Sequence, residues 1–165
     1  MALTKLGPAE ANTSGNLPAV GTAAPSFVFT STDMKDISSH EFKGKNIVLN
    51  IFPSVDTSVC AASVHEFNKR AAELDNTIIL CVSKDLPFAQ KRFCGTEGID
   101  RALIVSDFRA RGFGKDYGVE LVDTSFAGLF ARAVVVIDPQ GKVTYTELVP
   151  QIGEEPDYES ALNAI

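Results

Sequence analysis

The strongest constraint on the fold is a series of short apolar runs that recur along the chain with helical patterns between them. Ile47–Phe52 is almost continuously apolar, and similar runs lie at Ile78–Val82, Leu103–Ser106 and Ala133–Ile137. Runs of this length are typical of strands that are buried on both faces of a sheet. The sequence therefore predicts a buried sheet whose strands come from distant parts of the chain.

Helical patterns occupy the segments between these runs. From Cys60 onward, apolar residues recur at the spacing of one helix face. They are Val64, Phe67, Ala71 and Leu74. Shorter helices are expected at Pro87–Phe93, Arg109–Tyr117 and Pro156–Ala164. Strands that alternate with helices predict an α/β domain whose central sheet is partly parallel.

The two ends of the chain add further pieces. A turn joins Ala133–Ile137 to Val143–Val149, which predicts an antiparallel hairpin. Phe27–Thr30 and a short stretch around Ile37 predict two small strands. The first 25 residues are rich in Gly, Pro, Asn, Ser and Thr and predict loop or a loose hairpin. No repeat or linker divides the chain, so residues 1–165 are expected to form one domain.

Composition and charge narrow the possible functions. The 165 residues are 45% hydrophobic and 22% charged, which is typical of a globular protein. The formal net charge of −6 disfavours nucleic acids and anionic membrane surfaces as partners. No run approaches the ~20 apolar residues of a membrane helix, and the N-terminus lacks the apolar core of a signal peptide. Three cysteines do not form the even set of a small disulfide-rich domain, so we expect a cytoplasmic protein whose thiols serve chemistry.

Cys60 lies where the most buried strand meets the best helix. The loop that follows Ile47–Phe52 places this cysteine in the first turn of the helix or just before it. Unpaired N–H groups and the positive end of the helix dipole favour a thiolate there. The alternative is a buried, inert cysteine that begins the apolar face, and the junction alone does not decide between the two.

Three residues of the preceding loop bear on this choice. Thr57 has a hydroxyl that can donate to a substrate oxygen and can also cap the helix. Pro53 has a rigid ring that can wall a pocket, or it only terminates the strand. Asp56 is expected to cap the helix rather than to take part in chemistry.

The pattern Pro-x-x-x-Thr-x-x-Cys formed by Pro53, Thr57 and Cys60 resembles the active-site signature of peroxiredoxins. The stretches LNIFPSVDTSVCAASV, DLPFAQKRFCGTEG and ARAVVVID are similar to those of bacterial thiol peroxidases, which are atypical two-cysteine peroxiredoxins. This resemblance extends from about Leu17 to Tyr158. It implies a thioredoxin-like fold, with a central mixed sheet flanked by helices and an N-terminal extension. It also implies a homodimer that reduces hydroperoxides at the expense of thioredoxin.

The other two cysteines are expected to differ in reactivity. Cys94 follows a short helical segment, and Gly95 is expected to cap that helix. From the residues alone, Cys94 is either a minor core residue or an accessible thiol. The resemblance implies that it is the resolving cysteine, which forms an intramolecular disulfide with Cys60. Cys81 lies inside an apolar run and is expected to be packed and unreactive.

Arg132 opens the run Ala133–Ile137 and is either a surface cation at a strand end or part of the site. If that strand lies antiparallel beside Ile47–Phe52, Arg132 approaches Cys60 across one strand spacing of ~4.8 Å plus its own reach. A guanidinium so placed stabilises a thiolate, and the resemblance assigns this role to Arg132. His65 follows Cys60 at a helical spacing that points it away from the thiol.

We therefore expect a thiol-dependent peroxidase in which Cys60 attacks hydrogen peroxide or an alkyl hydroperoxide, with no metal or organic cofactor. Two other functions could use the same residues. A thiol redox sensor would relay oxidation from Cys60 to a partner protein, whereas a non-catalytic binding module would keep its cysteines in the core. Motifs for other chemistry are missing, since the sequence contains no CxxC, no HExxH and no glycine-rich phosphate loop.

Overall fold

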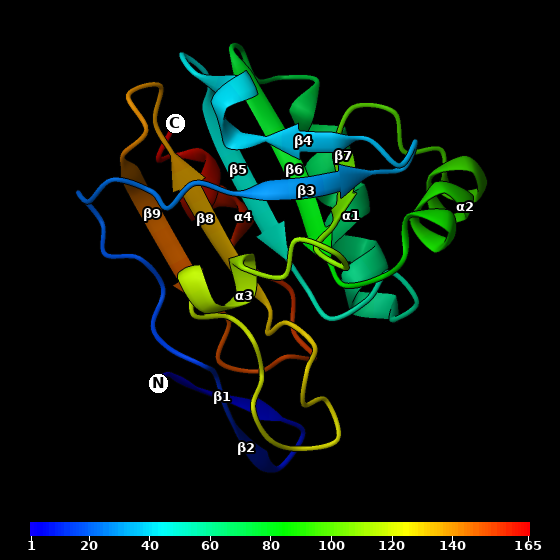
Figure 1. Cartoon of the computed structure of the whole chain (residues 1–165), viewed down its shortest axis with the longest axis vertical. Helices are drawn as coiled ribbons and strands as arrows, with labels where there is room; N and C mark the ends of the chain where they lie inside the picture. Colours follow the sequence, from blue (N-terminus) through cyan, green and yellow to red (C-terminus); the bar gives the residue numbers. More distant parts are fainter.

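The computed structural model describes residues 1–165 and contains a seven-stranded sheet and a separate two-stranded hairpin (Figure 1). The hairpin consists of β1 (Leu3–Leu6) and β2 (Ala9–Asn12). The large sheet consists of β3 (Val28–Ser31), β4 (Asp36–Ser38), β5 (Asn46–Ile51), β6 (Thr77–Ser83), β7 (Leu103–Ser106), β8 (Ala133–Ile137) and β9 (Val143–Leu148). The helices are η1 (Ser39–Phe42, a 3₁₀ helix), α1 (Ser58–Ala71), α2 (Pro87–Glu97), α3 (Phe113–Asp116) and α4 (Tyr158–Leu162).

The sheet is mixed, in the spatial order β4-β3-β7-β6-β5-β8-β9. β5, β6 and β7 are parallel, with α1 and α2 in the two crossover connections. β3 and β8 pair antiparallel with β7 and β5, and β8 and β9 form the predicted hairpin. The predicted α/β class is therefore confirmed. The carboxyl ends of β5, β6 and β7 lie along one edge, which is where open α/β sheets usually carry their sites.

Both faces of β5 are covered, which explains its nearly continuous apolar sequence. Ile47, Leu49 and Ile51 belong to one buried cluster, together with side chains from α3. Val48 and Phe52 belong to a second cluster, which includes buried residues of α1, α2 and α4. In Figure 1, α1 and α4 lie behind the sheet and α3 lies in front of it.

α2 extends beyond its predicted end. The sequence predicts that the helix stops at Phe93 with Gly95 as its cap, but α2 continues to Glu97. Gly98 caps it at a φ of 68°, and its N–H donates to the carbonyl of Cys94. Either glycine could adopt the left-handed conformation of a cap, so the prediction of Gly95 is wrong although the residue type is right. Cys94 consequently lies inside the helix and not at its end.

Two helix starts also differ from prediction. Thr57, not Asp56, occupies the N-cap position of α1, and Asp56 is exposed. α3 begins at Phe113 rather than at Arg109, because Arg111 adopts a φ of 65° that a right-handed helix cannot contain. The longest helix, α1, has 14 residues, and no helix of the structure could span a membrane.

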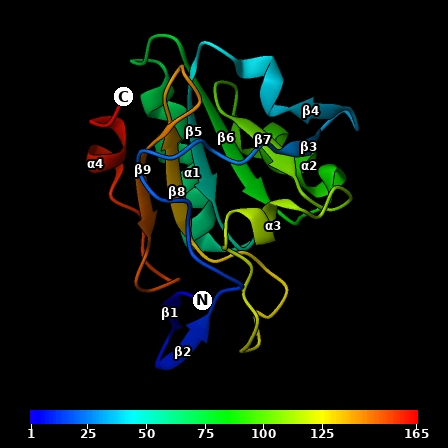
Figure 2. The same ribbon diagram turned by 60° about the vertical axis from the view of Figure 1, so that its left-hand side comes forward.

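The N-terminal residues form an ordered hairpin, whereas composition predicts loop or a loose hairpin. In Figures 1 and 2 the hairpin lies beyond one end of the large sheet. The Thr4 hydroxyl donates to the carbonyl of Val149 at 2.8 Å, and the Ile152 N–H donates to the carbonyl of Lys5 at 2.8 Å. These bonds attach the hairpin to the segment that follows β9.

Gly118 allows the N-terminal segment to pass close to the residues that follow α3. It has a φ of +67°, and a Cβ atom there would lie 2.3 Å from the carbonyl oxygen of Asn16. Gly141 has a φ of +83° but nothing within 4 Å of a Cβ atom. We expect Gly141→Ala to lower the free energy of unfolding by about 1–2 kcal/mol through backbone strain alone. Gly118→Ala should lower it further, because the clash must also be relieved. Urea titrations measure both values, and equal losses would contradict this account.

Candidate active site

Cys60 lies at the carboxyl edge of the sheet, in the first turn of α1. The chain leaves β5, crosses a short loop and begins α1 at Ser58. Cys60 is fully buried, within the cluster that packs α1 against the sheet. It therefore begins the apolar face of the helix and also lies among the first N–H groups of that helix. Cys60 therefore has both of the positions that the sequence offered as alternatives, at the start of a helix and in the core.

Arg132 enters this site from the neighbouring strand. Ile51 pairs with Ala133 in the antiparallel β5–β8 register, so Arg132 lies beside the end of β5. Its side chain is 2% exposed, and Nη2 donates to Cys60 Sγ at 3.2 Å. Its Nε atom donates to the carbonyl of Ile152 at 2.7 Å. The predicted strand adjacency is confirmed, and the alternative of a surface cation is wrong.

No carboxylate neutralises this buried guanidinium. Arg132 takes part in no ion pair, and its Nη1 atom has no hydrogen-bond partner. Desolvating a cation without a counter-charge costs several kcal/mol. A thiolate on Cys60 is the anion best placed to offset that cost. The unpaired Nη1 atom leaves a donor free for an additional acceptor, such as a substrate oxygen.

Thr57 and Pro53 lie in the loop between β5 and Cys60. Thr57 has the extended backbone of an N-cap residue, but its hydroxyl bonds no helix amide. Instead Oγ1 donates to the carbonyl of Ser54 at 3.2 Å. A hydroxyl has a single donor, so Thr57 must exchange this bond before it can donate to a substrate. Pro53 is buried at the start of the loop.

Asp85 fixes this loop from the neighbouring strand, and the sequence did not reveal it. Its carboxylate accepts from the Ser54 hydroxyl at 2.7 Å, the Val55 N–H at 2.9 Å and the Ser83 hydroxyl at 2.6 Å. In the sequence Asp85 looks like an ordinary turn residue ahead of Pro87 and α2. Its loop partner Val55 lies 30 residues away, so no local pattern could have indicated the contact.

The cysteines are all free, and their surroundings differ. Cys81 is fully buried in β6, as predicted, and burial raises its pKa to about 12. Cys94 is half-buried in α2 against the cluster that contains Cys60, and burial raises its pKa as well. Both of these thiols are therefore held mainly in the protonated form at neutral pH.

Neither histidine belongs to this site. His65 lies on the exposed side of α1, as predicted, with Nε2 3.3 Å from Oε2 of Glu97 on α2. His40 lies in η1, which precedes the other end of β5. No group of three or more His, Cys, Asp or Glu side chains is arranged to hold a metal ion.

A further acidic residue that the sequence did not reveal, Asp107, lies at the same sheet edge after β7. It is 1% exposed, and neither of its carboxylate oxygens has a hydrogen-bond partner. Burial raises its pKa to about 6, against the opposing effect of Lys84. Asp107 is thus a buried carboxyl that gains its charge near neutral pH without a direct partner.

This arrangement defines a class of protein, namely a thioredoxin-like α/β domain with a buried cysteine–arginine pair at the start of a helix. Residues 19–162 match the Redoxin family. The chain is 59% identical to a thiol peroxidase of Mycobacterium tuberculosis over 154 residues, which cover 93% of this chain and 92% of that protein. It is 52% identical over 165 residues to a thiol peroxidase of Corynebacterium glutamicum, which covers 100% of this chain and 99% of that protein. The chain belongs to the Redoxin family, within its thiol peroxidase group.

Solved structures agree with this assignment. A peroxiredoxin-like protein from Aquifex aeolicus has a TM-score of 0.93 and 37% sequence identity, covering 99% of this chain and 95% of that one. A thiol peroxidase from Chromobacterium violaceum has a TM-score of 0.91 over the same shares of the two chains, and at 19% identity it supports the fold alone. The thioredoxin-like fold implied by the sequence resemblance is confirmed.

Asp85→Ala is expected to slow peroxide consumption by about tenfold, because the loop loses the acceptor for two of its own donors, the Ser54 hydroxyl and the Val55 N–H. Ser54→Ala removes only one of these bonds and should have a smaller effect. Steady-state kcat/KM for hydrogen peroxide measures both, and thermal unfolding checks that the variants are folded at the assay temperature. An unchanged kcat/KM in Asp85→Ala would show that the loop is held without this carboxylate.

Asp107 is expected to make stability depend on pH in the direction opposite to that of an ion-paired acid. Its pKa is 3.8 when unperturbed and about 6 in the folded chain, so the folded state binds the proton more tightly. Stability should therefore fall as pH rises through this window. Asp107→Asn cannot ionise and should raise Tm at pH 8 by about 2–4 °C relative to the wild type, with no gain at pH 4.

The control for Asp107 is Asp123, whose pKa is lowered by hydrogen bonds from Asn12. Asp123→Asn should lower Tm at pH 8 and lose that effect at acid pH, because the folded state there prefers the charged form. Differential scanning calorimetry at the two pH values compares the variants. A gain for Asp107→Asn that is the same at pH 4 and pH 8 would rule out ionisation as its cause.

Proposed function

We propose that this chain reduces hydrogen peroxide and alkyl hydroperoxides, with Cys60 as the attacking thiolate and Cys94 as the resolving thiol. The observation that carries the proposal is the buried guanidinium of Arg132, which has Cys60 Sγ as a partner and no carboxylate near it. Such a pairing favours the charged form of the thiol. A structural, inert cysteine would not require a buried guanidinium beside its sulfur.

In the first step the Cys60 thiolate attacks the outer oxygen of the hydroperoxide. A sulfur–oxygen bond forms, the oxygen–oxygen bond breaks, and the departing oxygen takes up a proton and leaves as water or an alcohol. The free Nη1 atom of Arg132 and the hydroxyl of Thr57 are the donors available to hold the peroxide oxygens. Pro53 walls the site and helps to exclude water.

In the second step Cys94 condenses with the sulfenic acid on Cys60. A disulfide forms and water is released, which is a reversible stage of cysteine oxidation. Cys60 is fully buried and Cys94 is held in α2, so this step requires the end of α2 to open. In the third step a dithiol partner, thioredoxin by family resemblance, reduces the Cys60–Cys94 disulfide by thiol–disulfide exchange.

The proposal extends to the domain structure, the oligomeric state and the cellular location of the protein. Residues 1–165 act as one domain, supported by the single large sheet that runs through the chain. The active form is a homodimer in the cytoplasm, as the resemblance to the thiol peroxidases implies. Leu86 and Phe88 leave apolar surface exposed at the start of α2. This surface adjoins Asp85, which binds the catalytic loop between β5 and α1, and a thioredoxin or a second subunit docks on it.

Substitution of each cysteine separates the three thiols. Cys60→Ser should abolish peroxide consumption, because no other thiol lies beside Arg132. Cys94→Ser should consume about one equivalent of peroxide and then stop cycling with thioredoxin and its reductase, because the sulfenic acid is not resolved. Cys81→Ser is the matched control and should retain activity. NADPH oxidation in the coupled assay and single-turnover peroxide loss measure the two stages.

The outcomes distinguish the peroxidase from a thiol redox sensor. Full cycling by Cys94→Ser would eliminate the resolving role. A sensor that relays oxidation to another protein would give a different pair of results. The wild type would be oxidised fast in a single turnover but would consume negligible peroxide in the presence of thioredoxin and its reductase.

A further inference from the structure

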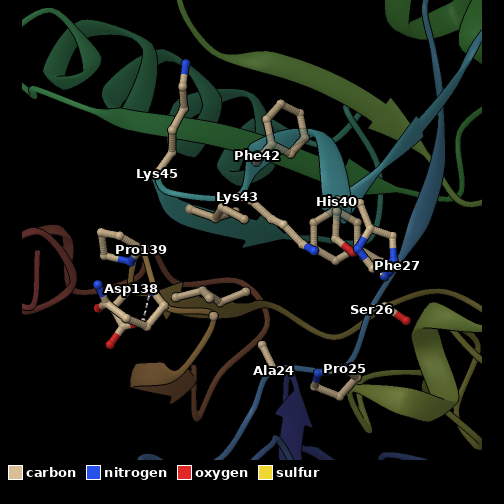
Figure 3. Close-up of a pocket in the computed structure, with 15 residues that line it drawn as sticks. Ala24, Pro25, Ser26, Phe27, His40, Phe42, Lys43, Lys45, Asp138 and Pro139 are labelled. Atoms are coloured by element: carbon tan, nitrogen blue, oxygen red, sulfur yellow. Dashed lines mark hydrogen bonds between the residues drawn. The ribbon is translucent and has the colours of Figure 1, made fainter.

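A pocket unrelated to Cys60 lies at the opposite end of β5. Its volume is about 330 Å³, within the range of small-molecule sites. Its apolar walls come from Ala24, Pro25, Phe27, Phe42, Ile47 and Ile137. In Figure 3, Ala24 and Pro25 lie on one side of the pocket, and His40 and Phe42 of η1 lie on the other.

The pocket is remote from the catalytic site in two ways. Ile47 is at the start of β5 and Phe52 follows its end, and five residues of strand span about 17 Å. Ile47 and Ile137 also belong to the cluster on one face of the sheet, whereas Cys60 belongs to the cluster on the other face. Binding at this pocket therefore needs no contact with the peroxide site.

The polar rim of the pocket contains lysines without an ion-pair partner and one aspartate. Lys43 makes no ion pair and no side-chain hydrogen bond, and Figure 3 shows its ammonium group directed toward His40 and Phe27. The lining acid, Asp138, uses Oδ1 to accept from the N–H groups of Gln140 and Lys142, both at 2.9 Å. Asp138 thus directs this oxygen to backbone donors, and Lys43 has no ion-pair partner.

The segment that carries the cation is fixed before any ligand arrives. Ser38 and Glu41 form a capping box at the start of η1, with the Ser38 N–H donating to Glu41 Oε2 at 2.7 Å. His40 belongs to η1 and Lys43 is its C-cap residue. A rigid backbone lowers the entropic cost of binding, because the ligand then has to order only the side chain of Lys43.

We propose that this pocket binds a small organic anion with a flat or branched apolar body and one carboxylate. The body lies between Phe27, Ile47 and Ile137, and the carboxylate pairs with the ammonium group of Lys43 beside His40. This site is additional to the peroxidase function and does not depend on it.

The probes are 2-naphthoate and its neutral analogue 2-naphthalenemethanol, measured by isothermal titration calorimetry on the full chain. We expect naphthoate to bind with a Kd below about 1 mM, and the alcohol to bind at least about fivefold more weakly, because only the carboxylate pairs with Lys43. Equal affinities, or no binding of naphthoate at 1 mM, would overturn the proposal.

Lys43→Met and Lys45→Met form a matched pair of variants. Lys45 also lines the pocket, but Figure 3 shows its side chain extending away from the other lining residues, so its loss should change naphthoate affinity by less than about twofold. Lys43→Met should weaken naphthoate at least about fivefold and leave the alcohol unchanged. Ala24→Leu should weaken both probes by filling the apolar space. Peroxide consumption should be normal in all three variants, which confirms that they are folded, and equal effects of the two lysine variants would overturn the assignment of Lys43.

Discussion

The buried guanidinium of Arg132 beside Cys60 is the interaction on which the rest of the site depends. A desolvated cation requires acceptors, and the fold supplies Cys60 Sγ and the carbonyl of Ile152. Ile152 is itself held by the N-terminal hairpin, because its N–H donates to the carbonyl of Lys5. The hairpin thus contributes to the site although it lies outside the large sheet. It fixes the acceptor that orients the arginine, and the arginine in turn donates to the sulfur of Cys60.

Much of the fold could be predicted because its signals are local. β7 and β8 have the predicted bounds, since apolar runs mark buried strands wherever they pair. Helix boundaries that depend on the backbone conformation of a single residue could not be predicted from the sequence. Gly95 and Gly98 both fit a helix cap, and only the φ of Gly98 identifies the residue that serves. The predicted start of α3 is wrong for the same reason, since a non-glycine residue, Arg111, takes a positive φ.

The residues of the candidate site also differ in whether a local sequence pattern could identify them. Thr57 and Cys60 are close in sequence, so a local motif was sufficient to find them. Arg132 could be placed only by assuming that β8 lies beside β5, which spacing along the chain does not specify. Asp85 carries no local signal at all, because its carboxylate acts on a loop that precedes it by a strand and a helix. Residues that contact the site from a neighbouring strand can be identified only after the order of the strands in the sheet is known.

The two ends of α2 have different relations to the site, and this difference suits the proposed disulfide. Its start follows Asp85, whose carboxylate fixes the loop that carries Thr57. The buried side chains of α2 end at Phe93, so in its last turn only the half-buried Cys94 packs against the core, and the next buried side chain, Ile99, lies beyond the helix. Local unfolding is easiest where few apolar contacts must break. The end of α2 can therefore open to release Cys94 while its start keeps the catalytic loop in place, so the resolving step need not dismantle the site that formed the sulfenic acid.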